Sequence, residues 1–92
     1  MSAVEIEEVL RKHPAVREAA VIGVADALRG QIAKAFVVAS RSGPDLEVEL
    51  QEFLKSRLSR HEYPRAVEFV DELPKTPAGK IDRRALRERA TG

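Results

Sequence analysis

Apolar residues at the start of the chain recur at the spacing of an α-helix. Ile6, Val9 and Leu10 fall on one face, which predicts an amphipathic helix over residues 3–12. Pro14 lacks the backbone N–H that a further turn would use, so the helix is expected to end before it.

Two continuous apolar runs follow and predict a pair of buried strands. The first covers residues 16–24 and is β-branched toward its end, and the second covers residues 32–39. Asp26 and Gly30 are turn formers in the connection between them. Because that connection is short, the two strands are expected to pair antiparallel.

The second half of the chain opens with a loop at residues 41–44 and continues into a strong helical pattern. The apolar residues of that pattern are Leu46, Leu50, Phe53, Leu54 and Leu58. Asp45 is placed to cap this helix, and Tyr63–Pro64 closes it. A third strand is predicted over residues 66–70.

In the last part of the chain, the predicted structure changes from loop to helix after Lys80. Residues 71–80 include two prolines and a glycine and predict a loop without regular structure, whereas residues 81–89 predict a short basic helix. The order of elements predicts one α+β domain over residues 1–92. We expect a small three-stranded, mainly antiparallel sheet packed with helices on one side.

Composition excludes several classes of protein. The chain has 92 residues, 43% hydrophobic and 34% charged, which fits one globular domain rather than a disordered segment. Its net charge of +1 gives no overall attraction to nucleic acid or membrane, although residues 75–89 carry six basic side chains against two acidic ones. With no cysteine, the chain has no disulfides, no thiolate catalysis and no cysteine-based zinc site.

The ends of the chain add expectations about location. The first residues turn acidic at once, unlike a signal peptide, and the longest apolar run, residues 19–24, is too short to span a bilayer. We expect a cytoplasmic protein. This opening fits a piece of a longer protein or a free-standing domain, and composition does not choose between them.

Most candidate chemistry from single residue types fails on spacing. His13 and His61 are far apart and have no ligand partners at metal spacing, so no metal site is expected. The glutamates of residues 5–8 and 47–52 fall mainly on the polar faces of helices and are expected to be solvated. No serine has the Gly-x-Ser-x-Gly setting of a hydrolase nucleophile.

Lys80 is the one residue whose setting leaves a choice open. It follows Gly79 as in a P-loop, but Pro74 replaces the first glycine of that motif and Ile81 replaces its Ser or Thr. From local composition, Lys80 is either a mobile positive charge that reaches an anion on another surface or an ordinary exposed lysine.

A longer motif around Lys80 resembles that of a known family. Residues 73–81, Leu-Pro-Lys-Thr-Pro-Ala-Gly-Lys-Ile, with Arg83, Arg84 and Leu86, resemble the terminal motif of the adenylate-forming superfamily. That superfamily contains acyl-CoA synthetases, adenylation domains of peptide synthetases and firefly luciferases.

The resemblance extends over nearly the whole chain. Residues 4–10, 13–24 and 29–38 are similar to the family's small C-terminal domain, with Gln31 where Glu is usual. The stretch from Tyr63 to Val70 is most similar to short- and medium-chain acyl-CoA ligases and benzoate-CoA ligases.

The resemblance implies a two-step ATP-dependent reaction and a role for Lys80. In the family, a carboxylic acid attacks the α-phosphate of Mg²⁺-bound ATP, and coenzyme A then attacks the acyl-adenylate. Lys80 matches the catalytic lysine of the first step, and Thr76 and Gly79 are its neighbours in the phosphate-contacting loop. A cation suits this position because the carboxylate and the triphosphate repel each other.

The same resemblance implies a second set of residues for the second step. Arg29, Lys55 and Tyr63 match positions that contact coenzyme A, the two cations suiting its phosphates and the tyrosine suiting packing. Each is otherwise an exposed side chain or a tyrosine at the edge of the core.

The family's large N-terminal adenylation domain and the hinge are not in these 92 residues. This domain alone is therefore expected to be inactive, to bind neither ATP, Mg²⁺ nor coenzyme A tightly, and to have that large domain as its partner. Two alternatives stay open: a binding module whose basic end docks nucleic acid, and a free-standing subunit that completes a separately encoded large domain.

Overall fold

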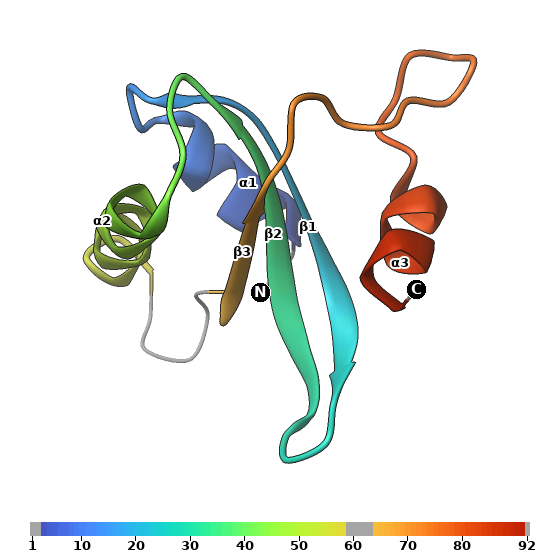
Figure 1. Ribbon diagram of the computed structural model, residues 1–92, viewed down its shortest axis with the longest axis horizontal. Coiled ribbons are helices and arrows are strands. Elements are labelled where there is room, and N and C mark those ends of the chain that lie inside the picture. The colour runs from blue at the N-terminus through green and yellow to red at the C-terminus, as the bar shows by residue number, and fades with distance from the viewer. Residues whose placement is uncertain (1–2, 59–63, 92) are drawn as a thin grey trace.

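The computed structural model describes residues 3–58 and 64–91, which form three helices around a three-stranded sheet. The elements in chain order are α1 (Ala3–Arg11), β1 (Val16–Asp26), β2 (Gly30–Ala39), α2 (Pro44–Lys55), β3 (Ala66–Phe69) and α3 (Arg83–Thr91) (Figure 1). The α+β class and the predicted order of elements are therefore confirmed.

The sheet is mixed, in the order β1–β2–β3. β1 and β2 form a long antiparallel hairpin with Val21 opposite Ala35, as predicted, whereas β3 runs parallel to β2 with Val67 opposite Ala35. The parallel pairing follows from α2, because a strand that returns through a crossover helix re-enters the sheet in the same direction.

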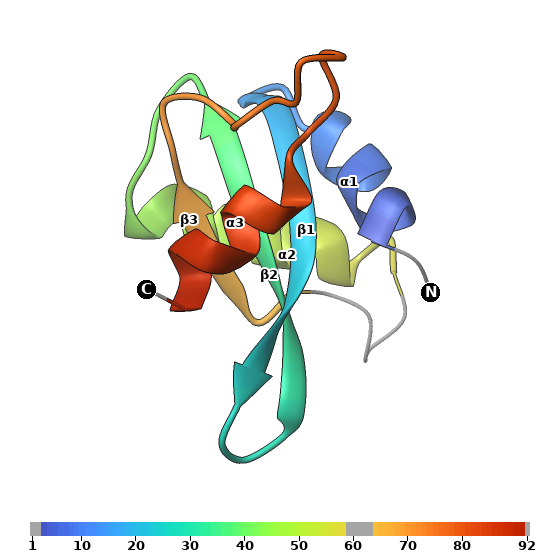
Figure 2. The same ribbon diagram turned by 90° about the vertical axis from the view of Figure 1, so that its right-hand side faces the viewer.

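The helices cover both faces of the sheet, so the expectation of helices on one side is wrong. One core cluster joins α1 and α2 to the sheet through side chains such as Leu10, Leu50 and Val37. The other joins α3 to the opposite face through Phe36 and Leu86. Figure 2 shows α3 lying across the face of the sheet turned away from α2.

The physical reason is visible in β1 and was available in its sequence. Its four consecutive residues Ala19, Ala20, Val21 and Ile22 are all buried, although successive side chains point to opposite faces of a strand. A continuous apolar run of this kind is typical of a strand covered on both sides.

Two helix starts differ from expectation. Gly43, not Asp45, is the N-cap of α2, with φ 114° and Pro44 at the first helical position; Asp45 lies in the first turn, where a negative charge suits the helix dipole. α3 begins at Arg83 rather than at residue 81, because the Asp82 carboxylate accepts a hydrogen bond from the Ala85 N–H (3.0 Å) and acts as a cap.

Residues 3–58 and 64–91 lack two features that the sequence was not expected to provide. No helix there is long and apolar enough to cross a membrane. The same residues contain no group of three or more His, Cys, Asp or Glu side chains that could hold a metal ion.

Candidate functional site

The segment that carries Lys80 lies outside the named helices and strands, as predicted, and is an ordered loop closed by one isolated β-bridge. Lys75 and Ile81 form an antiparallel bridge, and the Asp82 N–H donates to the Pro74 carbonyl at 2.8 Å. Closer to the tip, the Thr76 N–H donates to the Lys80 carbonyl at 2.7 Å. We call residues 74–82 the lysine hairpin.

The tip of the lysine hairpin is a tight turn built from the residues that its sequence offers. The Gly79 N–H donates to the Thr76 carbonyl (2.9 Å), which places Pro77 at the position of a four-residue turn that proline favours. Gly79 has φ +83°, a conformation that a side chain disfavours, and it is followed directly by Lys80. The Thr76 hydroxyl accepts the Lys80 N–H at 3.3 Å.

The Lys80 side chain is exposed at the end of this hairpin. Within residues 3–58 and 64–91 its amine has no hydrogen-bond or ion-pair partner, whereas Lys75 pairs with Glu18 at 3.1 Å. Figure 1 shows the hairpin projecting beyond α3 and the end of the sheet. The ammonium group of Lys80 is therefore held on an ordered segment, where a molecule or another domain can contact it.

A buried ion pair lies at the base of the hairpin. The Glu7 carboxylate accepts two hydrogen bonds from Arg83, at 2.7 and 3.0 Å, and a third from the Val21 N–H at 2.7 Å. Arg83 also donates to the Val21 carbonyl at 3.0 Å. The hydrogen bonds and charge of Glu7 raise the pKa of the Arg83 guanidinium.

Glu7 is a site residue that the sequence pattern missed. Glu7 is only 3% exposed, so the expectation that this glutamate is solvated is wrong. A signal existed, because Glu7 precedes Leu10 by three residues and so lies about 60° from it on the helical wheel, close to the buried face. The sequence marked Arg83 only as a residue of the motif around Lys80 and did not predict its contact with Glu7.

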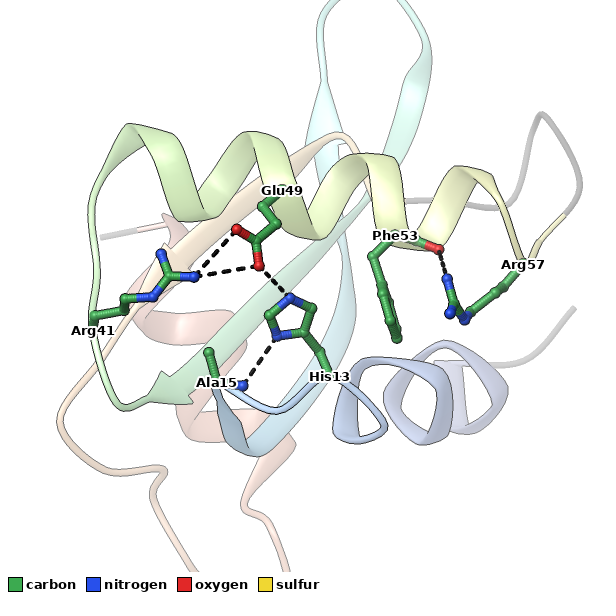
Figure 3. A network of polar contacts seen from close by, with 6 residues as sticks. All are labelled: His13, Ala15, Arg41, Glu49, Phe53 and Arg57. Carbon is green, nitrogen blue, oxygen red and sulfur yellow. Dashed lines mark hydrogen bonds and ion pairs between the residues drawn. The ribbon is translucent and has the colours of Figure 1, made fainter.

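His13 is also buried and hydrogen-bonded, which the expectation of a histidine at a helix end did not include. The imidazole is buried, its Nδ1 accepts the Ala15 N–H at 3.1 Å, and its Nε2 therefore carries the proton that it donates to Glu49 (Figure 3). The hydrogen bonds from Arg41 and then from His13 lower the pKa of Glu49. The network ties the chain just after α1 to α2.

The His13 ring also packs against α2. Its edge meets the Phe53 ring with centroids 5.0 Å apart, and the Arg57 guanidinium lies over the same ring at 3.7 Å (Figure 3). These contacts fix the side of α2 that faces α1 and leave its outer side open.

Arg29 and Lys55, two of the three residues expected to contact coenzyme A, lie away from Lys80 (Figure 1). Arg29 is exposed in the β1–β2 turn, where the Asp26 carboxylate accepts its backbone N–H at 2.8 Å. Lys55 is exposed at the end of α2 and pairs with Glu52 at 3.7 Å. Tyr63 lies outside the described residues.

Lys80 and Arg29 do not form one site. In Figure 1 the β1–β2 turn and the lysine hairpin stand at opposite ends of the domain. Lys55 instead borders a shallow groove of about 510 Å³ along the outer side of α2, which Arg65 also lines. One domain therefore carries cationic side chains on well-separated parts of its surface.

Comparison with known proteins decides the family. Residues 5–80 match the family of AMP-binding enzyme C-terminal domains. The chain belongs to this family. The match ends at Lys80, so it includes residues 73–80 of the motif that suggested the resemblance.

Two relatives by sequence of this AMP-binding enzyme C-terminal domain are named as an acyl-CoA synthetase and a CoA ligase. It is 48% identical to the human mitochondrial acyl-coenzyme A synthetase ACSM1 over 96% of the chain. It is 49% identical to 4-hydroxybutyrate–CoA ligase 1 of Metallosphaera sedula over 92% of the chain. It spans 16% of each of these proteins.

Solved structures give the same family and fold. An acyl-CoA synthetase of Brucella canis matches 99% of the chain with a TM-score of 0.93 and 48% identity. A benzoate CoA ligase of Burkholderia xenovorans matches 95% with a TM-score of 0.85 and 51% identity. The chain covers 17% and 18% of those two chains.

Proposed function

We propose that this chain is the mobile C-terminal domain of an ATP-dependent acid–CoA ligase and that Lys80 serves acyl-adenylate formation. The observation that carries the proposal is the exposed Lys80 amine, which has no partner in the described parts of the chain and sits on an ordered hairpin. The relatives of the chain by sequence, which are named as an acyl-CoA synthetase and a CoA ligase, support the ligase class.

The first step places a carboxylate oxygen on the α-phosphorus of ATP. The bond between the α- and β-phosphates breaks and pyrophosphate leaves. Negative charges crowd together in this transition state, and a lysine ammonium between them offsets their repulsion. The long stem of Lys80 suits this role because its charge reaches a site formed by another domain.

The second step requires a different face of the same domain. The coenzyme A thiol loses its proton and attacks the acyl carbon, and AMP leaves. Arg29 and Lys55 are exposed away from the lysine hairpin and suit the phosphates of coenzyme A. With Tyr63, they stay candidates for that site, and the domain must turn between the two steps.

The large N-terminal domain is proposed to supply the rest of the machinery. ATP arrives with Mg²⁺, and the described residues offer no cluster of side chains to hold that ion. Adenylation by this chain is therefore proposed to depend on that partner. Cytoplasmic location stays a prediction, since several relatives are named as mitochondrial.

The nucleic-acid alternative gains no support from the basic end. Four of its basic residues form ion pairs within the domain: Lys75, Arg83, Arg84 and Arg89, with Glu18, Glu7, Glu88 and Glu68. Their charges are thus partly neutralised rather than gathered into one open stripe.

The test separates the two half-reactions in the full-length protein, or in this chain mixed with its large domain. Lys80→Ala is expected to lower acid-dependent pyrophosphate release by about 10²–10³-fold. It should leave thioester formation from supplied acyl-adenylate and coenzyme A intact. Arg29→Ala should show the opposite pattern.

Lys75→Ala is the matched control, because Lys75 lies on the same hairpin but pairs with Glu18. It should change neither half-reaction by more than a few-fold. Unchanged pyrophosphate release in Lys80→Ala would show that Lys80 is an ordinary exposed lysine and would refute the proposal.

A further inference from the structure

Glu7 is the buried charge for which the proposed reaction has no role. Its carboxylate lies under the edge of the sheet and accepts hydrogen bonds from Arg83 and from the Val21 N–H. β1 is the edge strand, so the outward N–H and carbonyl of Val21 have no partner strand. Glu7 and Arg83 satisfy these two groups and so join α1, β1 and the start of α3 at one point.

This point is close to Lys80 along the chain. Arg83 follows Lys80 by three residues, a reach of at most about 11 Å even for an extended chain. Asp82, between them, closes the base of the lysine hairpin through its hydrogen bond to Pro74. A displacement of Arg83 therefore displaces the lysine hairpin as well.

The other attachments of the hairpin are less directional: one exposed ion pair, between Lys75 and Glu18 at 3.1 Å, and two apolar side chains. Leu73 precedes it and Leu86 follows it, both buried in the cluster under α3. Apolar burial is proportional to area and tolerates small rotations, whereas a two-point arginine–carboxylate contact fixes orientation. The Glu7–Arg83 pair is thus the attachment that sets the angle at which the hairpin leaves the domain.

We propose that Glu7 is a positioning residue for Lys80 and acts through Arg83. The inference rests on the proposed role of Lys80 in adenylation. Displacing a catalytic group by about 1 Å can cost on the order of 10²-fold in rate. The thioester half-reaction uses a different face and does not depend on where Lys80 lies.

The test compares Glu7→Gln and Arg83→Lys in the full-length protein. Both variants keep a polar group but lose the paired, two-point contact. We expect kcat for acid-dependent pyrophosphate release to fall roughly 10- to 10²-fold, with KM for the acid unchanged. Thioester formation from supplied acyl-adenylate should stay within twofold.

Glu8→Gln is the matched control, because Glu8 is the next residue on α1 and is exposed. The decisive combination is Glu7→Gln in a Lys80→Ala background. If Glu7 acts through Lys80, the double variant releases pyrophosphate no more slowly than Lys80→Ala alone.

Three results would overturn the inference. They are an equal loss of both half-reactions in Arg83→Lys, no loss of either in both single variants, or a further loss in the double variant. Should Glu7→Gln fail to fold, Arg83→Lys decides, since that side chain is one-third exposed. If Lys80→Ala itself leaves pyrophosphate release unchanged, the proposed function fails first, and the inference fails with it.

Discussion

Gly79 determines how Lys80 can be presented. Its φ of +83° lets the chain turn back immediately before the lysine, so that the Lys80 carbonyl meets the Thr76 N–H. An added Cβ would meet nothing within 4 Å, so any cost of a side chain comes from backbone conformation alone. For a residue other than glycine that cost is about 1–2 kcal/mol.

We therefore expect Gly79→Ala to reduce adenylation more than stability. The exposed tip can relieve the strain by deforming, which moves Lys80 but leaves the buried flanks in place. A penalty of 1–2 kcal/mol corresponds to about a 5- to 30-fold loss in pyrophosphate release. Gly43→Ala is the control, because Gly43 has a positive φ and open space but lies at the start of α2. An equal loss of pyrophosphate release in both variants would contradict this reasoning.

The sequence pattern identifies some of the site residues and misses others. Lys80 stood out because a long motif surrounds it. Glu7 did not, because its partner Arg83 is 76 positions away and periodicity marks only the broad face of a helix. Contacts between residues distant in sequence depend on the fold, which local patterns do not specify.

At the scale of elements, the sequence predicted what each segment is better than where it packs. All three helices and all three strands were expected near their observed positions. The parallel direction of β3 and the place of α3 on the second face were not, because both depend on crossover geometry rather than on local pattern. The continuous apolar runs of β1 and β2 were the local signs of the second face.

Glu68 is the polar link between β2, β3 and α3. Lys34 in β2 contacts its carboxylate at 3.0 Å and Arg89 in α3 at 2.6 Å. The hydrogen bond from Lys34, with help from Arg89, lowers the pKa of Glu68 below 4.5. A lowered pKa means that the folded state favours the charged carboxylate.

The sign of the resulting pH dependence is fixed. Glu68 stabilises the fold fully above its unfolded pKa, and that contribution disappears as pH falls through the lower folded value. We expect Glu68→Gln to unfold more easily than wild type at neutral pH, with the difference shrinking below pH 4.5. Chemical denaturation across this range measures it. Glu72→Gln, at an exposed neighbouring site, should show no such convergence.

At the scale of the whole domain, the two ends proposed to function, at Lys80 and at Arg29, are joined by one folded body (Figure 1). The two core clusters lie on opposite faces, but both take side chains from β1 and β2, so neither can be lost alone. The Cα radius of gyration is 12.6 Å, and a compact chain of this length is expected near 12 Å. The lysine hairpin and the β1–β2 turn therefore belong to one compact body (Figure 1).

This unity predicts that the isolated chain folds but does not react. Calorimetry should give a single unfolding transition whose calorimetric and van't Hoff enthalpies agree. Acid-dependent pyrophosphate release by the same sample should be indistinguishable from a reaction without protein, because the proposed site of Lys80 is completed by another domain. Adding the separately produced large domain should restore release, and Lys80→Ala should abolish the restoration. Two resolved transitions would refute the shared core, and release by the chain alone would refute the division of the site between domains.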